Sequence, residues 1–77
     1  PDFADQLEFN IQSEKMLRAV RDSLTDKERI VIVLRYGLWN KEPQTQQEIA
    51  SVLGISRSYV SRIEKKALKK LNTALNG

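Results

Sequence analysis

With 77 residues and a net charge of +3, the chain is long enough for one small domain with a limited core. It contains no cysteine and no histidine, which excludes disulfides, thiolate or imidazole metal sites and the commonest general base, so we expect no enzyme, no metal and no cofactor. No apolar run approaches the roughly 20 residues of a membrane span, and no leader is visible, so we expect a cytoplasmic domain excised from a longer protein.

The first of about four predicted helices covers Phe3–Ser23 and carries two apolar stripes that are rotated relative to each other. These are Phe3, Leu7 and Ile11 in the first half and Leu17, Val20 and Leu24 in the second. The mismatch falls near Ser13. We therefore expect either a bend at that position or a loosely attached start.

A second helix is predicted at Asp26–Tyr36. Thr25 and Glu28 have the spacing of a capping box, and Gly37 follows the apolar run as a helix-ending glycine would. Apolar residues surround most of this helix, so it is either central to the fold or docks a partner on its second face. Its β-branched residues also fit a buried strand, but the capping signals and the lack of a partner strand favour a helix.

The last two helices are predicted at Gln46–Val52 and Arg57–Leu75, after a polar loop that contains Pro43. Thr45 and Glu48 form a second capping box, and Ser56 is a plausible N-cap. Ala50 is small enough for two helices to approach closely, and Gly54 tolerates the positive φ of a tight turn. Five apolar residues have the spacing to face inward from both helices: Ile49, Leu53, Ile55, Val60 and Ile63. The sequence therefore predicts an all-α fold, a small helical bundle that contains a helix-turn-helix over Gln46–Lys65.

The outward face of the last helix is polar and positively charged. Residues 54–77 hold six basic residues and one acidic residue, whereas residues 1–26 hold six acidic and three basic residues. Such segregation favours a polyanion on the basic side. Arg57 and Arg62 can each bond a guanine edge in the major groove, and Ser58 and Ser61 are short enough to permit close approach. The alternatives are a solvated helix face and, for the motif as a whole, a helical hairpin that merely packs. Lys69 and Lys70 either touch phosphate or are solvated.

Four segments resemble the C-terminal DNA-binding domain of bacterial sigma factors, in register and without gaps between about Leu24 and Leu71. They are Leu24–Arg29, Leu34–Leu38, Thr45–Ala50 and Ser58–Leu68. The stretch Gly54–Lys65 is most similar to the sporulation sigma factors. The resemblance implies a domain that reads the promoter −35 element, docks on the β-subunit flap of RNA polymerase core and acts in the bacterial cytoplasm. It also leaves room for an anti-sigma or activator protein.

The resemblance implies roles for individual residues as well. Arg57, Ser58, Ser61 and Arg62 match base-reading and adjacent phosphate-contacting positions. Contacts to the DNA backbone position a protein without reading the base sequence. The residues expected to make such contacts are Lys27, Arg35, Thr45, Gln46, Tyr59, Lys65 and Lys66. Tyr59 alternatively covers the helix flank. Ser58 and Ser61 stand where the primary sigma factor has a glutamate and an arginine, which implies a different preferred −35 sequence.

We expect residues 1–23 to be a helical segment or linker from a preceding sigma region and residues 24–77 to be the promoter-binding domain. Ile30 and Val33 are apolar where many relatives are polar, so they either pack on the N-terminal helix or meet a protein partner. Two other functions remain open. One is a repressor or phage-type regulator, which would bind a palindrome as a dimer where a sigma domain binds as a monomer. The other is an interaction module that uses the apolar second helix.

Overall fold

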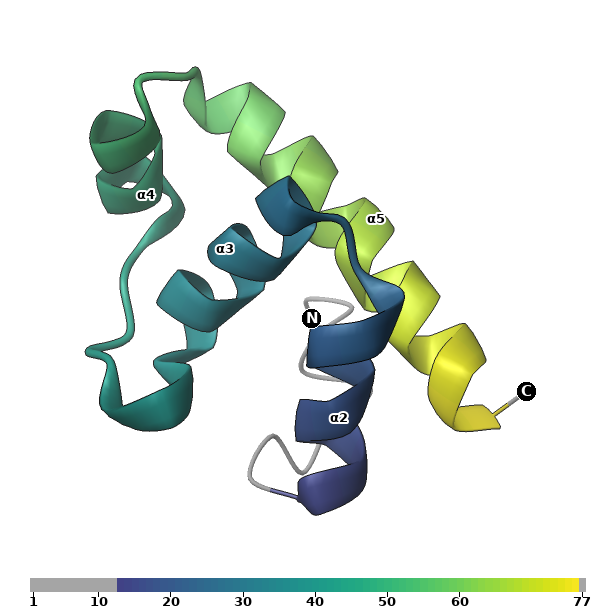
Figure 1. Cartoon of the computed structure of the whole chain (residues 1–77). Helices are drawn as coiled ribbons and strands as arrows, with labels where there is room; N and C mark the ends of the chain where they lie inside the picture. Colours follow the sequence, from purple (N-terminus) through teal and green to yellow (C-terminus); the bar gives the residue numbers. More distant parts are fainter. Residues whose placement is uncertain (1–12, 77) are drawn as a thin grey trace.

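The computed structural model describes residues 13–76, which form four α-helices and one short 3₁₀ turn, with no strand in that range. The elements are α2 (Glu14–Ser23), α3 (Asp26–Tyr36), η1 (Leu38–Asn40), α4 (Gln46–Leu53) and α5 (Arg57–Asn76). The long helix α5 packs against the other three helices, and α3 lies between α2 and α4 (Figure 1). The predicted all-α helical bundle is therefore confirmed.

Helix α2 begins later than predicted. Ser13 has an extended backbone (φ −69°, ψ 146°), and its hydroxyl accepts a hydrogen bond from the Met16 backbone N–H at 3.1 Å. A residue in this N-cap conformation cannot lie inside a helix, so a helix does not run unbroken through Ser13, the position at which the mismatched stripes predicted a bend or a loosely attached start. The predicted stripe of Phe3, Leu7 and Ile11 lies outside the described residues.

The predicted caps of α3 and α4 are confirmed. In both capping boxes the threonine hydroxyl accepts from the backbone of a glutamate three residues on, and that glutamate bonds the threonine N–H in return. Gly37 and Gly54 end the two helices in the left-handed conformation, at φ 65° and 70°. These four signals determine where α3 and α4 begin and end.

Helix α3 separates two apolar clusters, which explains why its sequence is apolar on most sides. Ile32 belongs to a cluster with residues of α2 and α5, and Val33 packs against that cluster. Val31 belongs to a second cluster with α4 and the first half of α5. The second helix is thus central to the fold, as one of the two expectations held. Ile30 faces neither cluster and is 45% exposed.

Arg29 fastens the end of α2 to the start of α3. Its guanidinium donates hydrogen bonds to the carbonyl oxygens of Val20, Arg21 and Leu24, at 2.8–3.2 Å. The last carbonyls of a helix have no partner within the helix, and a cation there also interacts favourably with the helix dipole.

Helix α2 shares one core with α3 and α5, because its Met16, Ala19 and Val20 are buried in the same cluster. The division into residues 1–23 and 24–77 stays a prediction.

Candidate nucleic-acid interface

The helix-turn-helix forms as the sequence predicts. After α4, the left-handed Gly54 turns the chain, and the Ile55 N–H donates to the Ala50 carbonyl at 3.1 Å. Ser56 then caps α5, because its hydroxyl accepts from the Tyr59 N–H at 3.0 Å. Ile49, Ala50, Val60 and Ile63 are buried between the helices with Val31, and Leu53 and Ile55 pack against them half-buried. The turn and this cluster hold the first part of α5 at the edge of the domain.

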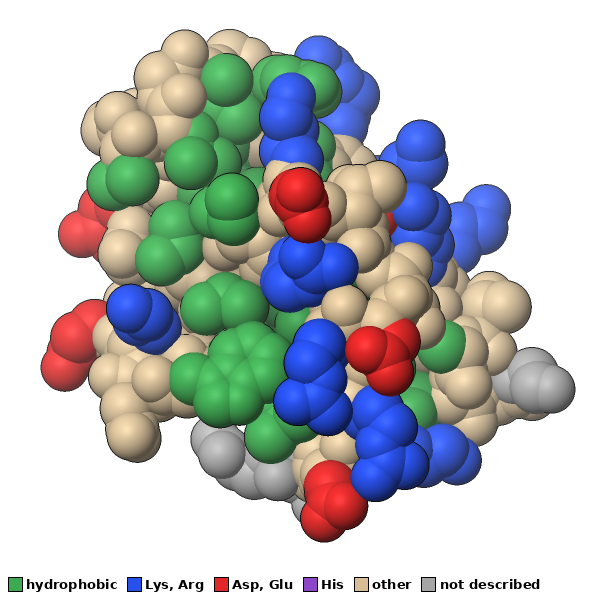
Figure 2. Space-filling view, in the orientation of Figure 1, with side chains coloured by type: hydrophobic (Ala, Val, Ile, Leu, Met, Phe, Trp, Pro, Cys, Tyr) green, Lys and Arg blue, Asp and Glu red, His purple; other side chains and the backbone are tan. Residues whose placement is uncertain are grey.

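The first two turns of α5 present the predicted reading residues to solvent. Arg57, Ser58 and Arg62 are exposed, and Ser61 is half-buried. Lys65 and Lys66 are exposed one turn further along. Within residues 13–76, no carboxylate forms an ion pair with these two arginines or two lysines. Figure 2 shows lysine and arginine side chains along α5 and over α2, with some acidic side chains among them, and hydrophobic side chains over α3 and α4. The positive charge on this face is therefore available to a polyanion.

Tyr59 links α5 to the start of α3. Its hydroxyl accepts a hydrogen bond from Lys27 Nζ at 3.2 Å, and that ammonium lies 5.1 Å from the ring centroid. The Arg62 guanidinium lies 5.6 Å from the same ring. Both distances fall within the range of cation–π attraction. The ring covers the helix flank, as one interpretation of the sequence held, and gathers two of the predicted DNA-binding cations around it.

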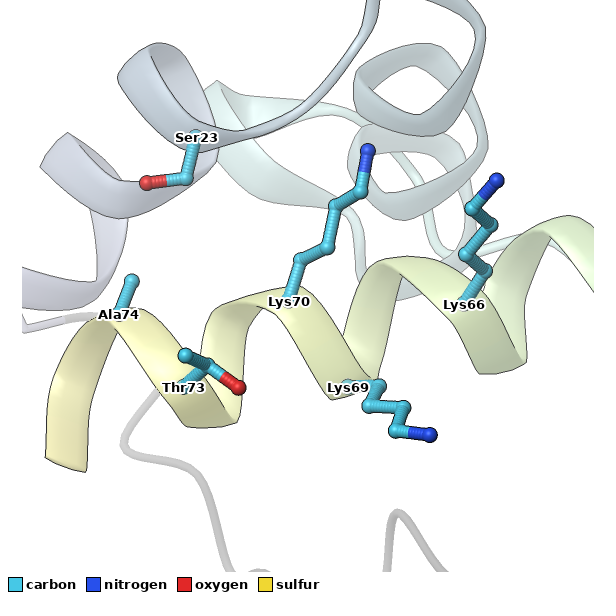
Figure 3. Close-up of a pocket in the computed structure, with 6 residues that line it drawn as sticks. All are labelled: Ser23, Lys66, Lys69, Lys70, Thr73 and Ala74. Carbon is cyan, nitrogen blue, oxygen red and sulfur yellow. The ribbon is translucent and has the colours of Figure 1, made fainter. Parts of the chain in front are cut away.

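A hollow of about 260 Å³ lies between the start of α3 and α5. Its lining residues are Thr25, Lys27, Glu28, Tyr59, Arg62, Ile63 and Lys66. A second hollow, of about 510 Å³, continues along α5 toward the end of α2 (Figure 3). Lys66 lines both hollows and extends from α5 toward the α2–α3 side. Lys69 lines only the second hollow, and its side chain points away from α2 and α3. The three cations of the first hollow come from two helices, which suits a backbone phosphate better than a flat lysine surface would.

Lys70 does not belong to this basic surface. Its ammonium lies 2.9 Å from the carboxylate of Glu28, which is 5% exposed. Burial raises the pKa of Glu28, but hydrogen bonds from the Thr25 backbone and from Lys70, together with the attraction of the Lys70 charge, outweigh it and hold that pKa below its ordinary value. Neither a solvated Lys70 nor a phosphate contact, the two expectations from the sequence, describes this pairing. Lys70 connects α5 to the capping box of α3.

Three predicted backbone contacts lie in the hydrogen-bond network of the domain itself. Arg35 pairs with Glu64 (Nε to Oε1, 3.5 Å), and Gln46 donates to the same carboxylate at 2.8 Å. The Thr45 hydroxyl serves its capping box. Their roles on DNA stay predictions, as do those of the exposed Lys27, Lys65 and Lys66.

The sequence interpretation did not single out Glu64, although a signal was present. It is the single acidic residue among residues 54–77, and it lies in register with the buried Val60, Ala67 and Leu68. A charged residue on the buried face of a helix indicates a polar partner on another element.

In the described residues no cluster of three or more metal-binding side chains occurs, and no helix is long and apolar enough to cross a membrane.

Comparison with known proteins places this arrangement in a family. The family model described as "Sigma-70, region 4" matches residues 22–73. The chain belongs to the sigma-70 region 4 family. It is 53% identical over 70 residues to the RNA polymerase sigma-K factor of Bacillus subtilis (strain 168), and 49% identical to the RNA polymerase sigma-28 factor of Bacillus thuringiensis subsp. kurstaki. It is 39% identical to the RNA polymerase sigma-E factor of Clostridium acetobutylicum.

Each alignment covers 91% of this chain but only 24–29% of the relative. The chain thus spans about a quarter of the length of the curated relatives it matches. The resemblance to sigma factors that the sequence motifs indicated is confirmed. The match from residue 22 to residue 73 includes α3, α4 and most of α5, and therefore the whole helix-turn-helix.

Proposed function

We propose that this chain is the −35 recognition domain of a sporulation-type sigma factor, which directs transcription initiation in the bacterial cytoplasm. The first turns of α5 enter the major groove as a monomer on one asymmetric site. The observation that carries this proposal is the exposure of Arg57 and Arg62 on the second helix of a helix-turn-helix, where no carboxylate of residues 13–76 forms an ion pair with either. In such motifs the start of the second helix contacts base edges while the first helix crosses the backbone.

Phosphate contacts in this proposal come from both sides of α5. Lys27 of α3 and Lys66 of α5 line the hollow beside Tyr59, and Lys65 is exposed on α5. Thr45 and Gln46 lie at the N-terminal end of α4, where the free N–H groups of a helix favour an anion. These contacts fix the register of α5 on the duplex, and the two arginines read the sequence.

Docking on RNA polymerase core, through the flap of its β subunit, is the second part of the proposal. It rests on membership of the sigma family and on exposed apolar side chains away from the reading residues. Ile30 on α3 and Trp39 in η1 are 45% and 47% exposed. Single exposed apolar side chains are common, so this part of the proposal depends on membership of the family, and Ile30 and Trp39 are the first residues to vary in a binding test.

Removal of either reading arginine tests the proposal. We expect Arg57→Ala or Arg62→Ala to cost about 1–3 kcal/mol on the cognate duplex and to relax the preference at one base position. The duplex is chosen by selection from a random pool, with and without core polymerase, and affinities are measured by titration. A single asymmetric motif, recovered better with polymerase, supports the proposal. A palindrome bound by a dimer would instead support a repressor, and an equal loss on every sequence would contradict base reading.

Lys66→Ala should weaken binding to all duplexes alike and should reduce the slope of log K against log salt by about one. The reason is that a phosphate contact releases counterions without reading a base. Lys69→Ala is the matched control, because Lys69 is exposed on the same helix but does not line the hollow beside Tyr59. An unchanged slope for Lys66→Ala would exclude Lys66 as a phosphate contact.

A further inference from the structure

One buried carboxylate connects all three helices around the helix-turn-helix. Glu64, on α5, is 5% exposed. It accepts hydrogen bonds from Gln46 Nε2 of α4 at 2.8 Å and from the Tyr36 hydroxyl of α3 at 3.3 Å, and its Oε1 lies 3.5 Å from Arg35 Nε of α3. The network extends to the loop before α4, because Arg35 also donates to the Gln44 carbonyl at 3.2 Å. The start of α4, the end of α3 and the middle of α5 therefore meet at one side chain.

Stability alone does not explain a carboxylate at this position. A buried ion pair costs much desolvation, and replacing such a group by apolar residues of similar size is often neutral or stabilising. Hydrogen bonds differ from apolar packing in being directional. Val60 and Ile63 hold α5 against its neighbours, but the hydrophobic effect that buries them is itself non-directional. Three polar partners on two other helices fix the rotation of α5 about its own axis.

The rotation matters because Arg62 lies two residues before Glu64 on the same helix. A turn of about 10° moves a group 6 Å from the helix axis by about 1 Å. Recognition groups need to be held to within about 0.5 Å and 10–20° of the productive geometry. A small rotation of α5 is therefore enough to misalign an arginine with a base edge while leaving its attraction to phosphates intact.

We infer that Glu64 is a positioning residue for DNA recognition, which fixes the rotation of α5 against α3 and α4 and thereby aims Arg57 and Arg62. This inference rests on the proposed function. It also gives Arg35 and Gln46 a role in binding that does not require either to touch DNA, since both act on α5 through the Glu64 carboxylate.

Glu64→Gln keeps the size of the side chain and removes its charge, so it tests the inference directly. The probes are the duplex that the wild-type chain selects from a random pool and the same duplex with one base pair of the motif changed. We expect the ratio of the two affinities to fall about tenfold, which is the discrimination of one bidentate base contact, with the salt slope unchanged. We also expect the backbone amide chemical shifts of residues 57–62 to move.

Ile32→Val is the matched control, because Ile32 is fully buried in the cluster with α2 and forms none of the hydrogen bonds or ion pairs of Glu64, although Tyr36 packs against the same cluster. It should keep both the affinity ratio and the amide shifts of residues 57–62, although it loosens the core. An unchanged ratio in a folded Glu64→Gln protein would overturn the inference. So would a ratio that falls equally in Ile32→Val.

Tyr36→Phe covers the case in which Glu64→Gln does not fold, since it removes only the hydroxyl that bonds Glu64. Tyr36→Phe should also lower the ratio of the two affinities, by a smaller factor than Glu64→Gln. A ratio equal to that of the wild-type chain would overturn the inference. In a folded double variant, Tyr36→Phe should add little to Glu64→Gln, because both break one network. If the wild-type chain selects no motif, the proposed function fails; the amide shifts then decide separately whether Glu64 positions α5.

Discussion

Gly37→Ala should lower the free energy of unfolding by about 3 kcal/mol, whereas Gly54→Ala should lower it by about 1 kcal/mol. Both glycines end a helix in the left-handed conformation, so alanine is strained at either position. The surroundings differ. A Cβ at Gly37 would lie 2.6 Å from the Lys41 carbonyl oxygen and 2.8 Å from two ring carbons of Pro43, but a Cβ at Gly54 would meet nothing within 4 Å. Only at position 37 must the loop before α4 move.

Chemical denaturation of the two variants and the wild-type chain measures this difference. A shift of the midpoint with an unchanged slope would report stability alone. A loss of about 3 kcal/mol is a large fraction of the stability of a domain of this size. Equal losses for the two variants would show that the loop between α3 and α4 moves freely away from an added methyl group.

The signals that sequence analysis used correctly were short-range. A capping box, a left-handed glycine and an N-cap serine involve residues no more than four apart, so residue type and spacing determine their geometry. This is why the bounds predicted for α3, α4 and α5 agree with the structure to within one residue at each end. Ser13 belongs to the same class. The mismatched apolar stripes mark its position, and serine is a residue type that favours an N-cap there.

The contacts that sequence analysis missed join residues far apart in the chain. Glu28 and Lys70 are 42 residues apart, and Tyr36 and Glu64 are 28 apart. Such pairs depend on which faces of the helices meet, and the periodicity of a single helix does not specify that. Trp39 and Asn40 were also missed. Both have positive φ in η1, a conformation for which Trp carries no sequence signal.

The candidate interface was predictable in its reading residues and less so in its surroundings. The spacing of Val60 and Ile63 predicts which face of α5 is buried. Arg57 and Arg62 lie on other faces of the same helix, so their exposure follows from that spacing. The pairing of Arg35 and Gln46 with Glu64 could not be read from spacing, because three helices have to pack before that site exists. Only their positions in the family motifs connect these two residues with contacts to the DNA backbone.

Lys70→Met is expected to lower the free energy of unfolding at neutral pH by about 2–3 kcal/mol, less than a fully buried pair would lose because the Lys70 side chain is 36% exposed. The variant keeps an apolar stem of similar length but leaves the buried Glu28 carboxylate without its cation. Lys69→Met, on the exposed side of α5, should change stability by no more than about 0.5 kcal/mol. The salt slope of DNA binding should stay at the wild-type value, since Lys70 is already paired.

The pH dependence of the same variant identifies Glu28 as the cause. In the wild-type chain the pKa of Glu28 is held below its ordinary value, so its stabilisation is present above the unfolded pKa and is lost as the pH falls through the lower folded pKa. Lys70→Met removes the charge that opposes the effect of burial, so the pKa of Glu28 is higher in the folded variant than in the folded wild-type chain. The difference in stability between the two proteins should therefore be largest near neutral pH, should begin to shrink where Glu28 of the variant takes up its proton, and should stop changing once Glu28 of the wild-type chain has taken up its own. Denaturation of both proteins from pH 7 to about pH 3 measures it. A difference that is constant across this range would mean that Lys70 stabilises the domain through its stem and not through the Glu28 charge.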